Sequence, residues 1–480
     1  MTLIARREAI SRRELLLIGS TAVAQAAHGA PGSSSHIGPG WASILDFPGA
    51  DPTGATPSTS ALQAAFDASR RVYLPEGLFT VGGDGVRPQS GTELRGAGPG
   101  SVLRQLDGLT NQVLNLEGGS PNPALNLRDV ILRGFKIQGL VGSLGFSEHQ
   151  HLLRISGATR ILVEDLVFEG YRGDGLYLAG SGRKGDPRHN QDITITKCLF
   201  DGVNRDNRNG ISVIDCDMLR IESNRFTRST RPNMPGAIDV EPNKNDWHVI
   251  HDIKILNNQF FANGGGGGSI CLFFPYVPFK SPPKGISIEG NTIEGAGVDD
   301  LDKGIFVKHL GSAGLDQPEH QVVIRDNTVR NTQHGFRVAG LRGVNVEANR
   351  FIGTSTSPMV GSANNTSGCI DVTIFRNQFF ELASDPTKGG DGLQIFTVAN
   401  LRVIENTFSN CGRTDGTKGC AITFSGGQSS NVTMRANSIK NDQGRTQKAV
   451  IRERNHKLAS DSLDVSANHW AGLRSDLPDQ

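Results

Sequence analysis

The feature that most constrains this chain is a short pattern that returns about every 30 residues: an asparagine, any residue, and then a large apolar residue. Ile137, Phe168 and Phe200 occupy the same place upstream, where the asparagine is missing. The spacing predicts about a dozen structural repeats between residues 137 and 470. The asparagines of the pattern are Asn224, Asn258, Asn291, Asn327, Asn349, Asn377, Asn406, Asn437 and Asn468.

A second row of short segments keeps the same period, and each segment reads small, apolar, variable, apolar. Two strand rows with one common period indicate stacked coils, in which each coil buries its apolar side against its neighbours. We therefore expect an all-β fold, a single-stranded parallel β-helix of about twelve coils, with the asparagines stacked inside at a turn. The second-row segments begin at Gly175, Gly210, Ala237, Ser269, Gly304, Gly335, Gly392 and Ala421.

Residues 58–71 predict the one clear helix of the chain. Leu62, Ala65 and Phe66 form one apolar face, and Ser60 with Gln63 matches a capping box. A stack of coils has an open first edge that must be covered. We expect this helix to cap it.

Four segments close to the N-terminus resemble the start of the pectate lyase superfamily. They are residues 46–54 (Asp-Phe-Pro-Gly-Ala-Asp-Pro-Thr-Gly), 61–67, 72–79 and 91–98. Members of that superfamily are right-handed parallel β-helices, so the resemblance implies this fold for a domain at residues 46–480. Because lyases, hydrolases, epimerases and phage tailspikes share the fold, it implies a polysaccharide or oligosaccharide partner but no single reaction. The Gly-His-Gly and Arg-Ile-Lys motifs of polygalacturonases and the Asp-Pro-His motif of mannuronate epimerases are absent.

The first 30 residues have the features of an export signal. Arg12-Arg13 precede Leu15-Leu16-Leu17 and a short apolar run, an order that resembles the twin-arginine type. A lone membrane anchor is the alternative. Residues 31–45 read as a linker, and we expect a periplasmic or secreted protein with no membrane span in the mature chain. With 49 basic and 48 acidic residues, no global field favours nucleic acid.

The candidate catalytic residues lie on the outward face of the second row. Asp239 and Glu241 point the same way from one strand, about 7 Å apart at Cα, and we expect both side chains in solvent. Paired carboxylates at this range suit glycoside hydrolysis, one as acid and one as nucleophile or base. The alternative is two solvated acids without a role.

Candidate substrate-binding residues surround this pair. Arg forks bind carboxylates, so turn arginines favour an acidic or substituted polysaccharide, although they can instead pair with Asp174 and Asp206. Aromatic side chains offer faces for sugar rings. Asp174, two coils from Asp239, can line the same groove. The residues assigned to binding are Tyr177, Asp174, Arg205, Arg208, Arg231, Phe273, Phe306 and His334.

A second mechanism is β-elimination on a uronate polymer. Lys308 or Arg337 then takes the proton or neutralises the carboxylate. No cofactor is expected, except that Asp299, Asp300 and Asp302 can hold Ca²⁺. A third reading is a non-catalytic glycan-binding β-helix. The cysteines are expected to be structural, although Cys411 and Cys420 are near enough in sequence to pair.

Overall fold

Three parallel sheets run through the molecule, and the chain visits them in turn, once per coil. The computed structural model describes residues 38–108, 112–118, 126–183, 186–295, 303–310, 318–362, 368–385, 391–413, 419–459 and 463–477. Residues Gly40–Gln480 form one compact unit. The expected export signal at 1–30 and the first part of the expected linker lie outside the described residues.

Sheet A has 16 strands, and each pairs with the corresponding strand of the next coil. They are β1 (Ala42–Ser43), β2 (Arg71–Leu74), β4 (Glu93–Gly96), β7 (Leu127–Arg133), β10 (Ala158–Glu164), β15 (Gln191–Thr196), β18 (Cys216–Glu222), β21 (Ile250–Leu256), β24 (Lys284–Glu289), β27 (Val322–Arg325), β30 (Arg342–Glu347), β33 (Cys369–Phe375), β36 (Val398–Ile404), β39 (Gln428–Arg435), β42 (Lys457–Leu458) and β43 (Leu463–Ser466).

Except for Asn468, the asparagines of the repeated pattern lie directly before strands of sheet B. Sheet B has 13 strands. They are β3 (Gly77–Val81), β5 (Ser101–Gln105), β8 (Lys136–Gln138), β11 (Val167–Glu169), β16 (Leu199–Asp201), β19 (Arg225–Thr227), β22 (Gln259–Phe261), β25 (Thr292–Glu294), β28 (Thr328–Arg330), β31 (Arg350–Ile352), β34 (Gln378–Phe380), β37 (Thr407–Ser409) and β40 (Ser438–Lys440).

Sheet C has 12 strands and corresponds to the second row of the sequence. They are β6 (Leu114–Glu117), β9 (Leu153–Ser156), β12 (Leu176–Ala179), β17 (Ile211–Val213), β20 (Ile238–Val240), β23 (Ile270–Phe274), β26 (Ile305–His309), β29 (Phe336–Ala339), β32 (Met359–Val360), β35 (Asp391–Ile395), β38 (Cys420–Phe424) and β41 (Lys448–Arg452).

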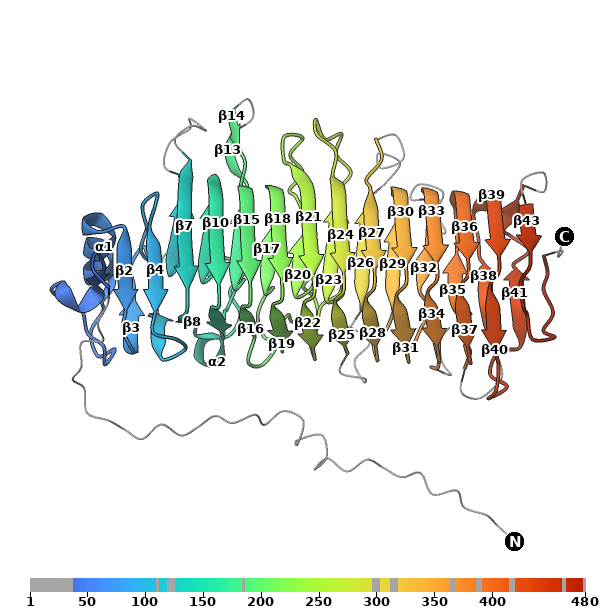
Figure 1. The fold of residues 1–480 in the computed structure, drawn as a ribbon, viewed down its shortest axis with the longest axis horizontal. Coiled ribbons are helices and arrows are strands. Elements are labelled where there is room, and N and C mark those ends of the chain that lie inside the picture. The colour runs from blue at the N-terminus through green and yellow to red at the C-terminus, as the bar shows by residue number, and fades with distance from the viewer. Residues whose placement is uncertain are drawn as a thin grey trace, which may run out of the picture. The chain divides into compact units, whose positions relative to one another are not determined.

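The strands of successive coils lie side by side, as Figure 1 shows by the even change of colour along the stack. The described part also contains an antiparallel hairpin, β13 (Ser181–Arg183) with β14 (Asp186–Arg188). Its short helices are η1 (Ile44–Asp46) and α2 (Val141–Leu144). The predicted parallel β-helix of about twelve coils is confirmed.

The repeated asparagines form the buried ladder that the sequence predicts. Asn327 is typical: its Nδ2 donates to Asn349 Oδ1 at 2.9 Å and to the Ile288 carbonyl at 2.8 Å. Its own Oδ1 accepts from Asn291 Nδ2 at 2.9 Å. The ladder begins where the Cys198 amide donates to Asn224 Oδ1 at 2.9 Å. Each coil thus binds its neighbours through a side chain inside the turn from sheet A to sheet B.

Aromatic stacking runs beside this ladder. Phe168, Phe200, Phe226 and Phe260 stack ring on ring, with centroids 4.6 to 4.8 Å apart. That distance matches the spacing of strands in a sheet, so these four coils each place one ring in the column.

The corner before the ladder has left-handed backbone, and residues other than Gly and Asn also occupy it. Ala348, Arg376 and Glu405 adopt φ values of 53°, 53° and 54° there. Such residues are strained in this region. The ladder hydrogen bonds hold the corner in place, so the residue type matters less than the asparagine that follows.

Helix α1 (Thr59–Ala68) confirms the predicted helix and its apolar face, since Leu62, Ala65 and Phe66 are fully buried. The capping box expected of Ser60 and Gln63 is wrong. The N-cap is Ser58, whose side chain makes no cap hydrogen bond because its Oγ accepts from the Asp51 amide at 3.0 Å instead. Figure 1 shows α1 beside β2, and its role as a cap remains a prediction.

Candidate active site

The register of sheet C confirms the stripe of outward residues expected from the sequence. Tyr177, Ser212, Asp239, Cys271, Phe306 and Arg337 are direct partners on successive strands. Two residues further along the same two strands, Phe273 pairs with Lys308. Glu241 follows β20, and its amide donates to the Val213 carbonyl at 3.0 Å, which continues the parallel pairing. The acids and the basic residues therefore share one face.

The exposed position expected of Asp239 is wrong, because its side chain is only 1% exposed. It does point away from the core, since Ile238 and Val240 on either side are the residues that enter the core cluster. The residues that precede the sheet C strands fold over this outer face. Burial and the charge of Glu241 raise the pKa of Asp239 well above its ordinary value, against the opposing effect of Arg208.

A neutral Asp239 also agrees with its neighbour Asn209. The Asn209 amide lies 3.3 Å from Asp239 Oδ2. When its nitrogen donates to the carbonyls of Gly236 and Arg208, each at 2.9 Å, its oxygen accepts from Ser212 Oγ at 2.8 Å. That oxygen then faces Asp239, and a protonated carboxyl can donate to it. The second oxygen, Asp239 Oδ1, is buried and has no hydrogen-bond partner among the described residues.

Glu241 is the accessible member of the pair. Its side chain is partly buried, and burial raises the pKa of Glu241 above the usual value, partly offset by the Arg208 charge. The two carboxyl groups are therefore neighbours that both resist ionisation, and only Glu241 reaches the surface. A carboxyl that stays protonated near neutral pH can act as a general acid.

Asp174 is fully buried and so does not line an open groove. Its Oδ2 lies 2.8 Å from Arg208 Nη1 and 3.1 Å from His151 Nδ1. Burial alone raises the pKa of Asp174, but the charges of His151 and Arg208 outweigh burial and hold it below the usual value. The pairing of Arg208 with Asp174, which the sequence left open, is the one observed.

The other two turn arginines differ from Arg208. Arg231 lies 3.8 Å from Asp206 and stacks over the Phe146 ring at 4.4 Å. Arg205 is half-buried in the turn before β17, with φ at 59°. Arg208 also lies 4.0 Å from Glu148. It therefore interacts with three acids of this face, Glu148, Asp174 and Asp239.

Sequence reasoning singled out Asp174 and His334 but missed that they belong to one column of polar residues, which these turns place in line. Each lies two residues before a sheet C strand, and main-chain bonds keep the same register as the strands. Aligning the position directly before each second-row segment would have found it. The polar members are His151, Asp174, Asn209, Lys303 and His334.

Basic side chains gather two to three coils beyond the acids. Lys303, Lys308 and Arg337 are each partly buried, and burial lowers the pKa of each. None of the three pairs with a carboxylate of the described residues. Arg337 stacks over Phe306 at 5.8 Å, and Lys303 Nζ donates to the Gly266 carbonyl at 2.6 Å.

His334 is held by its neighbours at this basic end. Its Nδ1 lies 2.7 Å from Thr356 Oγ1 and 2.9 Å from the Ser357 carbonyl. Tyr177, at the other end of the face, stacks on His151 at 4.4 Å. Phe273 and Phe306 are partly exposed between the two ends, whereas Phe274 belongs to the core.

The possible Ca²⁺ ligands Asp299, Asp300 and Asp302 lie outside the described residues. Within the described ranges, no cluster of three His, Cys, Asp or Glu side chains is arranged to hold a metal ion. The described helices are also all too short or too polar to span a membrane. All six cysteines, Cys411 and Cys420 included, are free and buried.

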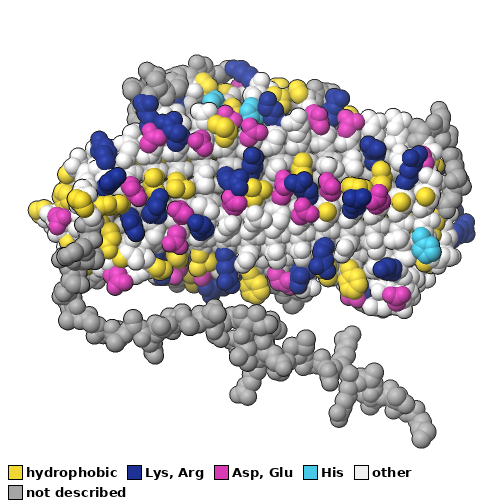
Figure 2. Space-filling model, viewed as in Figure 1, with side chains coloured by type: hydrophobic (Ala, Val, Ile, Leu, Met, Phe, Trp, Pro, Cys, Tyr) yellow, Lys and Arg dark blue, Asp and Glu magenta, His cyan; other side chains and the backbone are white. Residues whose placement is uncertain are grey.

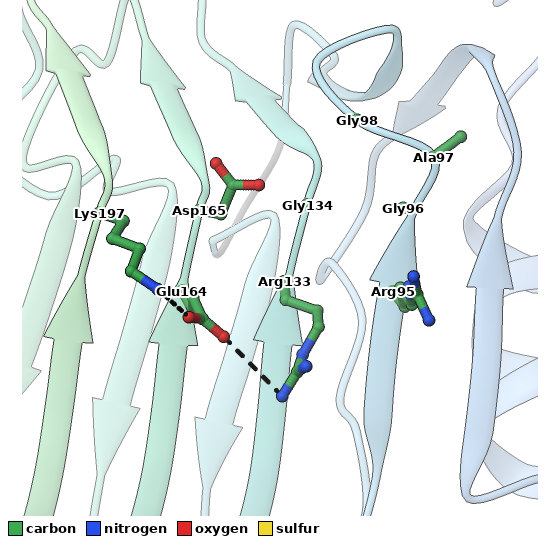
Figure 3. A pocket seen from close by; sticks show the side chains of 9 residues that line it. All are labelled: Arg95, Gly96, Ala97, Gly98, Arg133, Gly134, Glu164, Asp165 and Lys197. Carbon is green, nitrogen blue, oxygen red and sulfur yellow. Dashed lines mark hydrogen bonds and ion pairs between the residues drawn. The ribbon is translucent and has the colours of Figure 1, made fainter.

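On the corner between sheets A and B, basic side chains pair with an acidic one. A hollow of about 490 Å³ at the corner between sheets A and B contains Lys197, whose Nζ lies 2.9 Å from Glu164, and Arg133, which lies 3.9 Å from the same carboxylate (Figure 3). Figure 2 shows basic and acidic side chains interspersed in the same way over the face it presents. Lys303, Lys308 and Arg337 of the sheet C face differ, because they have no carboxylate partner among the described residues.

Comparison with known proteins supports the fold. A family model described as the right-handed β-helix region matches residues 187–379. The A-module of mannuronan C-5 epimerase AlgE6 from Azotobacter vinelandii is 16% identical, with a TM-score of 0.54 over 89% of this chain and 98% of that one. Gene product 12 of bacteriophage phi29 is also 16% identical, with a TM-score of 0.61 over 90% of this chain and 57% of that one.

One curated relative matches over a shorter stretch. Protein YclG of Bacillus subtilis (strain 168), described as uncharacterized, is 29% identical over 145 residues. The match spans 28% of this chain and 23% of YclG, less than a quarter of that relative's length. Taken with the three parallel sheets, these similarities identify a right-handed β-helix region whose fold is that of the pectate lyase-like parallel β-helices.

Proposed function

We propose that this protein is a polysaccharide-active enzyme that hydrolyses glycosidic bonds of an acidic or substituted polysaccharide on the outer face of sheet C. The observation that carries the proposal is the pair Asp239 and Glu241, two neighbouring carboxyl groups that both have a raised pKa. Glycoside hydrolysis needs one carboxylic acid that remains protonated and a second carboxyl group beside the scissile bond.

Glu241 is the proton donor in this proposal, because it is protonated more readily than an ordinary glutamate and reaches the surface. It protonates the leaving glycosidic oxygen. Asp239 is the second carboxyl group, and its burial requires that the turn at residues 205–209 moves when the polymer binds. Asp239 then releases its proton to water, and Arg208 favours the carboxylate that is left. This carboxylate takes a proton from the water that attacks the anomeric carbon, or attacks that carbon itself and is released by water in a second step.

The test is a panel of neutral and acidic polysaccharides, read in parallel for new reducing ends and for unsaturated products. Mannuronan belongs in the panel because one structural neighbour is a mannuronan C-5 epimerase. Glu241→Gln should lower the formation of reducing ends about 10²- to 10⁴-fold. The control is Glu347→Gln on sheet A. Unchanged activity of the Glu241→Gln protein would refute the assignment, and binding without chain shortening would favour a glycan-binding role instead.

β-Elimination is the second candidate, and the basic residues favour it. Burial and the charge of Arg337 lower the pKa of Lys308, which increases the fraction of neutral amine that is available to take a proton. Lys308 would take the proton next to a uronate carboxylate that Arg337 neutralises, and the leaving sugar oxygen would depart to leave an unsaturated ring. Unsaturated products that disappear in Lys308→Met, with reducing ends that persist in Glu241→Gln, would replace the first proposal by this one.

We also propose that the enzyme works in the periplasm or after secretion, directed there by residues 1–30. Replacement of Arg12 and Arg13 by lysine should keep the protein in the cytoplasmic fraction of an expressing cell, since a twin-arginine signal is read by its arginines. Export that continues unchanged would contradict this route.

A further inference from the structure

A second hollow lies on sheet B, on a different sheet from the candidate active site. Its volume is about 460 Å³, and it lies over strands β31, β34, β37 and β40 toward the C-terminal end of the stack (Figure 1). Two stripes of outward side chains form its floor. One consists of Arg350, Gln378 and Thr407, and the other of Ile352, Phe380, Ser409 and Lys440.

The centre of this floor is an aromatic ring that water reaches. Phe380 is 42% exposed, although large aromatic side chains of sheet B otherwise point mainly into the core. Gln378 stands two residues before it, and Ser409 is its direct partner on the next strand. A flat apolar ring edged by hydroxyl and amide groups is the kind of surface that fits one face of a sugar ring.

The wall of the hollow is held in position by hydrogen bonds. The Asn441 side chain donates to the Thr446 carbonyl at 2.8 Å and accepts from its amide at 2.9 Å, which closes the turn after β40. Gln443 binds Asn410 Oδ1 through its amide at 3.0 Å and Glu381 through its side chain at 2.9 Å. The hollow is thus preformed.

Three charged side chains line the hollow, the cations Arg350 and Lys440 and the carboxylate Asp442, so cations are in excess. Arg350 and Lys440 lie at opposite ends of the floor, three coils or about 14 Å apart. Neither forms an ion pair with a described residue, in contrast to the paired charges of sheet A such as Arg325 with Glu289 at 2.6 Å. Cations at both ends complement an extended anionic chain laid across the coils.

We propose that this hollow is a second, non-catalytic binding site for the same acidic polysaccharide, with a sugar ring on Phe380 and anionic groups near Arg350 and Lys440. The identity of the polymer rests on the proposed function, but binding at this site does not require cleavage. The site would hold the protein on its polymer while sheet C acts on another segment, so its contribution should be largest for long chains.

The experiment compares Phe380→Ala with Phe261→Ala. Phe261 lies in the same stripe of sheet B, is 50% exposed and is outside the hollow, so it matches in chemistry, strand position and exposure. Both substitutions are made in Glu241→Gln protein, which removes cleavage by the proposed acid. Affinity is measured by electrophoresis in gels containing each polysaccharide of the panel. Phe380→Ala should weaken binding about threefold to tenfold, and Phe261→Ala should not.

A second measurement separates this site from the active site. In protein with Glu241 intact, Phe380→Ala should slow the turnover of long polymer and leave the turnover of short oligosaccharides unchanged. Equal binding by the Phe380 and Phe261 variants, at equal melting temperatures, would overturn the second site and leave the proposed function standing. Loss of turnover on short oligosaccharides as well would place Phe380 in the catalytic machinery and would also overturn the proposal.

Discussion

Asp239 illustrates how a side chain can leave a strand on its outer face and still be shielded from water. Its neighbours Ile238 and Val240 enter the core, while Asn209 packs against its carboxyl group from outside. An isolated buried carboxylate is unfavourable, so the group holds its proton instead. The chemistry of this face therefore depends on what the turns cover as much as on which residues the strands carry.

This raised pKa predicts how stability varies with pH. Folded Asp239 keeps its proton above the pH at which the unfolded chain loses it, so its contribution is complete below about pH 4 and is lost as pH rises toward the raised pKa. Asp239→Asn keeps the neutral shape and should stabilise the protein relative to wild type increasingly as pH rises above about 4, up to the raised pKa, while it lowers hydrolysis.

Urea unfolding across that pH range measures the difference, with exposed Asp192→Asn as the control. Parallel curves for wild type and Asp239→Asn would mean that the carboxyl is ionised in the folded protein.

Part of this site follows from the sequence alone. The alternation of apolar and variable positions correctly places Asp239, Phe306 and Arg337 in one stripe, because strand register follows the repeat. The burial of Asp239 and Asp174 does not follow. It depends on turns whose path is set by contacts between coils, such as Arg208 reaching Asp174 across 34 positions of sequence.

At the scale of elements, the asparagine ladder is the part of the fold that the sequence predicts best, because each member is recognised by its own three-residue pattern. Inside the ladder an asparagine satisfies donors and acceptors of both adjoining coils, whereas Asn468 ends the series and is partly exposed. The two positions therefore have unequal consequences when the side chain is lost.

Asn327→Ala should destabilise the protein by about 2 to 5 kcal/mol, because it leaves buried groups of Asn291 and Asn349 unpaired. Asn468→Ala should have a clearly smaller effect. Chemical denaturation of both variants measures this, and equal losses would show that the interior of the ladder contributes no more than its end.

A buried histidine pair is a second element with a measurable consequence. His309 Nδ1 lies 3.0 Å from His320 Nε2, and His320 Nδ1 accepts from the Arg342 amide at 3.1 Å. Both rings are fully buried. Burial lowers the pKa of each to about 4, with the charge of His309 adding to the effect at His320.

Between pH 6.5 and 4 the unfolded chain therefore binds more protons at these two sites than the folded protein does, so stability should fall as pH decreases through that window. The slope of melting temperature against pH should be shallower in His309→Leu than in wild type. Exposed His149→Leu serves as control and should keep the wild-type slope. An unaltered slope in His309→Leu would contradict neutral burial of the pair.

At the scale of the whole molecule, the core holds together without covalent links between coils. All six cysteines are free and buried, and burial raises the pKa of the Cys198, Cys411 and Cys420 thiols to about 12. A thiol reagent should label none of them in the native protein and six in denaturant, and a reductant should leave the melting temperature unchanged. Fewer than six labelled thiols in non-reducing denaturant would reveal a disulfide.

The unequal connections between sheets have a consequence for how such a molecule can diversify. From sheet A to sheet B the chain crosses the ladder corner in the same short step each time, as from Leu256 to Gln259 and from Ile404 to Thr407. From sheet C to sheet A it takes paths of unequal length, as from Val240 to Ile250 and from His309 to Val322. Insertions in a lineage, or grafts by an engineer, are thus expected to be tolerated beside sheet C, the proposed catalytic face, and penalised at the ladder corner. A new specificity can then arise without rebuilding the scaffold.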